Sequence, residues 1–187
     1  MNKLLFILLF VVSNSCIAQD DEISKIRALY QKTTEEQLIA VMPAPDNYGT
    51  LYNNEIVINK YNGSWRAVGN YICKMNFWYT DQPAFAKEEH GKEESALRKV
   101  EMTSTWSANN IESFEFLYEN GELVFCLKKD ATYDNQEKPL EYRYYFSRGK
   151  LIRYMLGQET QKTLPDTKEV LANSQRMMNL FLTTFKY

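Results

Sequence analysis

The chain is poor in the residues that most often carry enzyme chemistry. Its 187 residues include three cysteines and a single histidine, His90. A catalytic base needs an orienting partner and a shielded pocket, yet His90 lies among Lys and Glu in a polar stretch. The sequence also contains none of the short motifs that cradle phosphates, expose a nucleophilic serine or hold a catalytic zinc. These absences favour a protein that is not an enzyme and needs no cofactor.

An excess of charge of one sign is also missing. Lys and Arg number 22 against 24 Asp and Glu, which gives a net charge of -2. No basic surplus is present to attract nucleic acid. Seven Gly and five Pro are too few for a collagen-like or low-complexity chain, whereas 44% hydrophobic residues can supply a core. We therefore expect one globular domain that does not bind nucleic acid.

The sequence has no hydrophobic run long enough to span a membrane, and the short apolar run near its N-terminus has the form of a secretory signal. Residues 4–12 form a nine-residue apolar run after Lys3, and small or polar residues follow at 13–18. A bilayer span needs roughly 20 residues, so this run is too short to cross a membrane. We predict a signal peptide over residues 1–18, cleavage after Ala18, and a mature α+β domain over 19–187 without a transmembrane segment.

Cys16 gives the N-terminus an alternative interpretation. A lipoprotein signal places a cysteine just after the apolar run, and that cysteine carries the lipid. Only the small residue before Cys16 fits this motif, because Ser13 stands where leucine is usual. Simple cleavage is therefore favoured over a lipid anchor at Cys16.

The two cysteines of the mature chain, Cys73 and Cys126, raise the question of a disulfide. Alternation along their two strands places Cys73 on the apolar face and Cys126 on the opposite one. Two sulfur atoms on opposite sides of a sheet cannot meet. Separate thiols are thus favoured over a disulfide, and no Cys/His cluster points to a metal site.

The remaining pattern predicts strands between two helices. Apolar residues recur at helical spacing over 20–41 and again after Pro165. Between them lie extended runs joined by two-residue turn signals at Asn62-Gly63, Asn120-Gly121 and Arg148-Gly149. Residues 81–95 are expected to form a polar loop. The predicted fold is α+β: an antiparallel, strongly twisted β-meander of about seven strands packed with an N-terminal and a C-terminal helix.

The second face of this sheet is richer in apolar groups than a solvated face should be. A two-residue turn at Arg148-Gly149 would place Tyr145 opposite Ile152 and Arg143 opposite Tyr154. Either a terminal helix covers this face, which is the simpler interpretation, or it binds a ligand. The candidate ligand-binding residues are Trp78, Arg143, Tyr145 and Tyr154, an aromatic platform with one arginine for a sugar, peptide or lipid fragment.

The general plan, an exported helix–meander–helix domain with tyrosine-rich hairpins, resembles uncharacterised envelope proteins of Gram-negative bacteria. That resemblance implies the periplasm or cell envelope, or secretion. Our leading hypothesis is a non-enzymatic binding or interaction module whose partner is an envelope protein, a glycan or an apolar small ligand. The alternatives are a periplasmic carrier of an apolar ligand and a secreted hydrolase that uses a pair of carboxylates, although no pair is singled out by the sequence.

Overall fold

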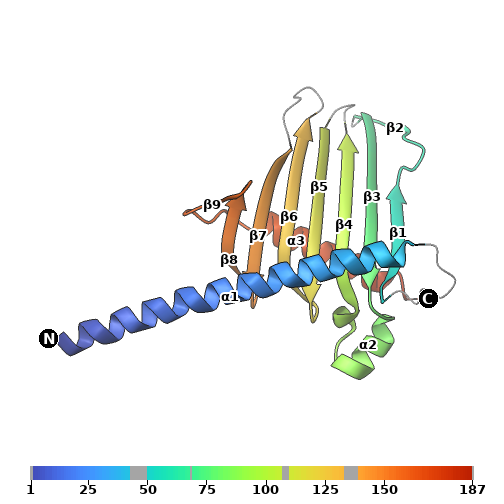
Figure 1. The fold of residues 1–187 in the computed structure, drawn as a ribbon. Helices are drawn as coiled ribbons and strands as arrows, with labels where there is room; N and C mark the ends of the chain where they lie inside the picture. The colour runs from blue at the N-terminus through green and yellow to red at the C-terminus, as the bar shows by residue number, and fades with distance from the viewer. Residues whose placement is uncertain (1, 43–49, 68, 107–109, 133–138, 187) are drawn as a thin grey trace.

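A computed structural model shows a single antiparallel sheet with one helix across each face (Figure 1). It describes residues 2–42, 50–67, 69–106, 110–132 and 139–186, and for residues 2–18 and 132 it describes the backbone alone. Helix α1 (Asn2–Ala40) crosses one face, and its first part extends past the edge of the sheet beyond β8. Helix α3 (Lys168–Thr183) crosses the other face.

The strands follow one another across the sheet in chain order, which confirms the predicted α+β meander. Two of the nine strands along the described residues are only two residues long, β2 and β9, so the seven longer strands match the expectation. The strands are β1 (Tyr52–Ile58), β2 (Ser64–Trp65), β3 (Gly69–Tyr79), β4 (Leu97–Trp106), β5 (Asn110–Glu119), β6 (Glu122–Thr132), β7 (Leu140–Ser147), β8 (Lys150–Leu156) and β9 (Glu159–Thr160).

Two of the three predicted tight turns are confirmed. Asn120 and Gly121 have φ of 49° and 74°, and Arg148 and Gly149 have φ of 51° and 72°, as a two-residue hairpin turn requires. The prediction for Asn62-Gly63 was wrong. Strand β1 does pair with β3, but the connection between them is longer and contains β2, which folds back on the start of β3. Asn62 has a positive φ and Gly63 does not, so the local signal marked a bend within this connection.

The prediction of a polar loop over residues 81–95 was wrong. This segment contains helix α2 (Pro83–His90) and the 3-10 turn η1 (Glu93–Ala96). Proline at the start of α2 has the φ that a helix needs, and Gly91 ends the helix in the left-handed region. Ala86 is buried against the main core. The many Lys and Glu side chains concealed this short apolar face from sequence reasoning.

The two faces of the sheet have separate cores. Aromatic and aliphatic residues of β3 to β8 pack with Val170, Met177 and Phe181 of α3, so the helix that was predicted after Pro165 is present and buries its apolar residues against the sheet. On the opposite face a smaller cluster joins Ile23 and Ile26 of α1 to strands β5 to β8. The predicted helix over 20–41 therefore exists as the second part of α1, and it covers one end of the second face.

Both cysteines are free and buried, as favoured, but the reason given for this was wrong. Cys73 and Cys126 belong to the same core cluster, on the α3 face of the sheet. Strands β4 and β5 lie between their strands, so the two thiols are separated by three strand spacings, about 14 Å. Lateral distance, and not opposite orientation, keeps them apart.

Candidate functional site

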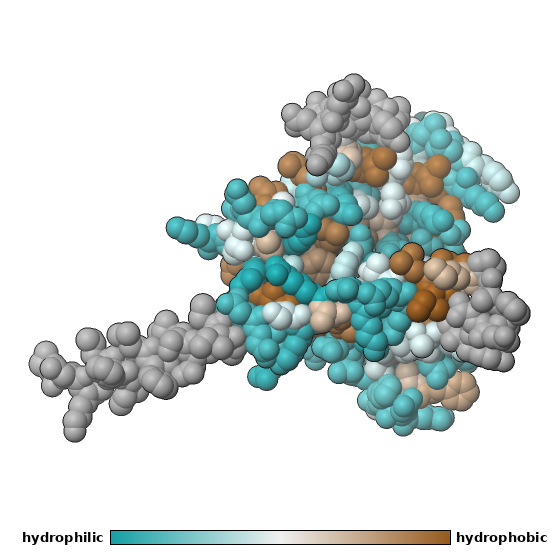
Figure 2. Space-filling view, in the orientation of Figure 1, coloured by the Kyte–Doolittle hydropathy of each residue, from teal (hydrophilic) through white to brown (hydrophobic). Residues whose placement is uncertain are grey.

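A hollow of 340 Å³ lies between α1 and strands β6 and β7, and we call it the α1 groove. Figure 2 shows this side of the molecule, with apolar surface on the sheet beside α1 among hydrophilic side chains. Helical spacing places the α1 residues on one side, and strand alternation places every second residue of β6 and β7 on the other. The lining residues are Ile26, Arg27, Tyr30, Phe125, Leu127, Lys129, Glu141, Arg143 and Tyr145.

The inner part of the groove is aromatic and aliphatic. Phe125 packs edge-on against Tyr30, with the ring centroids 5.4 Å apart. It also contacts the tilted ring of Tyr145, with the centroids 5.0 Å apart. Leu127 and Ile26 complete this apolar part and are themselves buried. Burial of these side chains under α1 both attaches the helix and leaves an apolar surface at its edge.

Three cations and one carboxylate surround the apolar part. Lys129 lies 3.9 Å from Glu141, and Arg143 donates to Glu141 and to the carbonyl of Gly157. Arg27 lies with its guanidinium carbon 5.7 Å from the ring centroid of Tyr145, and its Nε donates to the Tyr145 hydroxyl at 3.4 Å. Arg27 forms no salt bridge with any residue that the structure describes.

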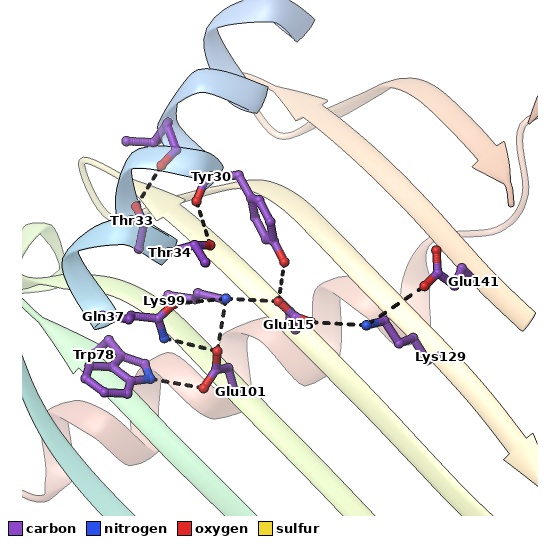
Figure 3. Close-up of polar contacts among 11 residues, drawn as sticks. Tyr30, Thr33, Thr34, Gln37, Trp78, Lys99, Glu101, Glu115, Lys129 and Glu141 are labelled. Atoms are coloured by element: carbon purple, nitrogen blue, oxygen red, sulfur yellow. Dashed lines mark hydrogen bonds and ion pairs between the residues drawn. The ribbon is translucent and has the colours of Figure 1, made fainter. Parts of the chain in front are cut away.

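A buried lysine connects the groove to the C-terminal end of α1 (Figure 3). The Lys99 side chain is 3% exposed, and its Nζ lies 3.0 Å from Glu101 and 2.9 Å from Glu115. Gln37 of α1 accepts from Lys99 at 3.1 Å and donates to Glu101 at 3.0 Å. Tyr30 of α1 donates to Glu115 at 2.6 Å. The ammonium group thus has the acceptors that a buried charge requires.

This network perturbs two titrating groups at the groove. Burial alone would raise the pKa of Glu115, but the Lys99 ammonium and the Tyr30 hydroxyl outweigh burial, and the pKa lies below its ordinary value. The pKa of Tyr30 is raised, first by burial and then by its hydrogen bond to Glu115. Glu115 is therefore ionised and Tyr30 is neutral around pH 7.

The four residues predicted to bind a ligand do not form one platform. Arg143 and Tyr145 both line the α1 groove. Trp78 is buried on the same face but lines a neighbouring hollow of 370 Å³, where its Nε1 donates to Glu101 at 3.1 Å. Tyr154 lies on the opposite face, where its ring stacks beside Tyr144.

A β-bulge accounts for the displaced tyrosine. Phe146 pairs with Leu151, as a two-residue turn requires. The register then shifts, and Tyr145 pairs with Arg153 while Tyr144 pairs with Tyr154. One extra residue in β8 moves every later side chain to the other face. The predicted pairs Tyr145 with Ile152 and Arg143 with Tyr154 were therefore wrong.

Sequence reasoning missed Arg27, Tyr30, Lys99, Glu101 and Glu115. Alternation does place Glu115 between Phe114 and Phe116, and a charged residue at such a position is usually solvated. Only the path of α1 over β4 and β5 encloses these charges, and that path is a tertiary feature. No cluster of side chains that could hold a metal ion occurs among the described residues, and this includes the acidic stretch at 88–94.

Comparisons of the chain with protein-family models, with curated proteins and with solved structures return no match. Among the described residues, no helix is both long and apolar enough to cross a membrane. Function must therefore be inferred from the α1 groove itself.

Proposed function

We propose that this protein is an exported, non-enzymatic binding module of the cell envelope and that the α1 groove holds its ligand. The observation that carries the proposal is the composition of the groove. An apolar, partly aromatic interior with a few converging polar groups is the usual form of a small-molecule site, and 340 Å³ lies within the usual size range. The N-terminal signal supports the location.

A second hollow, of 450 Å³, lies between the turns after β5 and β7 and helix α3. Its walls include the turn residues Gly121 and Gly149 and the charged side chains of Glu122 and Arg148. Its lining has one aromatic residue, Tyr118, where the α1 groove has three, and its other apolar residues are Leu123, Leu171 and Met178. The α1 groove is therefore the better candidate.

The hydrolase alternative would need one carboxylic acid that stays protonated beside one carboxylate. Glu101 and Glu115 are directly opposed across β4 and β5, so they are a candidate pair. Both contact Lys99, and the pKa of Glu115 is lowered, so Glu115 cannot serve as the acid near neutral pH. These contacts give the pair a structural role and favour binding over hydrolysis.

The carrier alternative would use the same groove for a wholly apolar molecule. Its three cationic side chains make such a ligand bind more weakly than one with a polar group, because an uncharged apolar surface removes water from charged groups without replacing its hydrogen bonds. A ligand with both apolar and polar parts suits the lining better.

The proposal is tested with a neutral fluorescent probe, N-phenyl-1-naphthylamine, and methyl NMR. We expect the probe to bind the 19–187 chain and to shift the methyl signals of Ile26 and Leu127. The signals of Leu97 and Val170, in the α3-face core, serve as the control and should stay in place. Absence of binding, or shifts confined to the α3 face, would overturn the proposal. Native mass spectrometry of the protein purified from its own host then gives the mass of a natural ligand.

A further inference from the structure

We infer that the ligand of the α1 groove is a small amphipathic anion and that Arg27 binds its anionic group. This inference rests on the proposed function and specifies the chemical class of the ligand. The anionic group can be a carboxylate, a sulfonate or a phosphate, because each accepts hydrogen bonds from a guanidinium in the same way. The remainder of the ligand is apolar or aromatic and contacts Phe125, Leu127 and Tyr145.

The charged side chains in and beside the groove include one more cation than carboxylate. Four cations, Arg27, Lys99, Lys129 and Arg143, face three carboxylates, Glu101, Glu115 and Glu141. Each carboxylate contacts at least one of the last three cations within 4.0 Å: Glu101 contacts Lys99, Glu115 contacts Lys99 and Lys129, and Glu141 contacts Lys129 and Arg143. The surplus positive charge is therefore located on Arg27.

The second step is the position of Arg27. It lines the groove from α1, one residue after the buried Ile26, and its side chain remains accessible to solvent. Its described contacts are weak: a 3.4 Å hydrogen bond to the Tyr145 hydroxyl, a cation–π contact with the Tyr145 ring, and a 3.8 Å contact with the sulfur of Met155. A guanidinium has five N–H donors, so several are free for an anion.

The third step is how the groove holds Arg27 in place. Stacking over the Tyr145 ring directs the guanidinium toward the apolar part of the groove. An anion bound there is close to Phe125 and Leu127 and partly out of water, where a charge-assisted hydrogen bond is stronger than at an open surface. Glu141, on the far wall, contacts both Arg143 and Lys129, so this wall adds no net repulsion toward an anion.

The test uses two probes that differ in one group. 1-Anilinonaphthalene-8-sulfonate is N-phenyl-1-naphthylamine with an added sulfonate, so the pair isolates the anionic group. At 150 mM salt we expect the wild-type chain to bind the sulfonate probe about five- to tenfold more tightly than the neutral probe. Arg27→Gln should remove this preference, so that the ratio of the two affinities falls to about one. Arg27→Lys, which keeps the charge but loses the planar fork, should retain part of it.

Lys32→Gln is the matched control. It removes the same charge from the same helix, but Lys32 is exposed, pairs with Glu36 at 3.8 Å and does not line the groove. It should change neither affinity, because its charge is exposed, already paired with Glu36 and outside the groove, and exposed charges are strongly screened at this salt concentration.

The outcomes separate the inference from the proposed function. If the neutral probe shifts Ile26 and Leu127 but the sulfonate probe binds no more tightly, the inference is wrong and the binding module stands. The same holds if Arg27→Gln weakens both probes equally. If neither probe binds the groove, both are wrong. Circular dichroism of Arg27→Gln confirms that the variant is folded, as expected for an exposed side chain.

Discussion

At the scale of single residues, Lys99 explains how α1 is fixed to the sheet. Removing an ammonium group from water costs several kcal/mol, and two carboxylates with the Gln37 amide offset that cost here. Its Nζ also lies 4.8 Å from the Tyr30 ring centroid. Because Tyr30 and Gln37 belong to α1, the charge of Lys99 specifies where along the sheet the helix lies.

Replacing Lys99 by Met should destabilise the fold by roughly 3–5 kcal/mol, because the partly buried Glu101 and Glu115 lose the buried cation that they share. The effect should depend on pH. In the wild type the pKa of Glu115 is lowered below its ordinary value of 4.5, so its contribution is present above that pH and is lost as pH falls through the folded pKa. Without Lys99, burial raises this pKa, and the variant gains stability as pH falls toward 4. Urea unfolding at pH 7 and pH 4.5 should show the difference between the two proteins shrinking.

Lys128→Met is the control for this prediction. Lys128 of β6 also forms an ion pair across the sheet, with Glu112 of β5 at 2.7 Å. It lies on the α3 face, and its side chain is 17% exposed. Its loss should cost about 1 kcal/mol. A cost for Lys99→Met no larger than that of Lys128→Met would show that the buried network does not hold α1.

At the scale of elements, the sequence predicted the strands better than their registers. The alternation of β5 and β6 and of β7 and β8, with their Gly-containing turns, was sufficient to predict both hairpins. Each hairpin also has a bulge near its turn, at Leu117/Tyr118 and at Tyr145/Phe146. No residue type marks these bulges, so alternation along the strands does not reveal them. The misplacement of Tyr154 follows from the second bulge.

The two turns allow a matched test of backbone strain and packing. Gly121 and Gly149 have nearly the same φ, so an alanine at either position should cost about 1–2 kcal/mol from the left-handed conformation alone. A Cβ at Gly121 would also lie 2.7 Å from the Cβ of Glu94, whereas nothing lies within 4 Å of a Cβ at Gly149. Overpacking adds about 1–3 kcal/mol. Chemical denaturation should therefore rank Gly121→Ala as clearly more destabilising than Gly149→Ala, and equal costs would contradict the close approach of η1 to this turn.

At the scale of the whole molecule, the layering determines which sequence patterns carry information about the site. The α3 face is apolar throughout its core, so periodicity predicted it. The α1 face combines an apolar end with charged residues, and sequence reasoning could interpret it only as a covered or ligand-binding face. Two of the four candidate ligand-binding residues, Arg143 and Tyr145, do lie together in the groove. The α1 side of the site escaped prediction because helical spacing shows which residues face a sheet but not which strands they meet.

The last prediction concerns the N-terminus of the functional protein. Gln19, the residue expected to follow cleavage, donates to the carbonyl of Ile152, and Asp20 pairs with Arg153. Ile23, Ile26 and the Lys99 network follow along the helix. A chain of residues 19–187 should therefore keep the contacts that attach α1. We expect it to unfold at the same urea concentration as the full chain, within error, and to bind both probes equally well.

In the native host, mass spectrometry of the envelope fraction should find Gln19, or its cyclised form, as the first residue. An intact Met1 in that fraction would contradict export by cleavage, and a lipid on Cys16 would establish the anchored alternative.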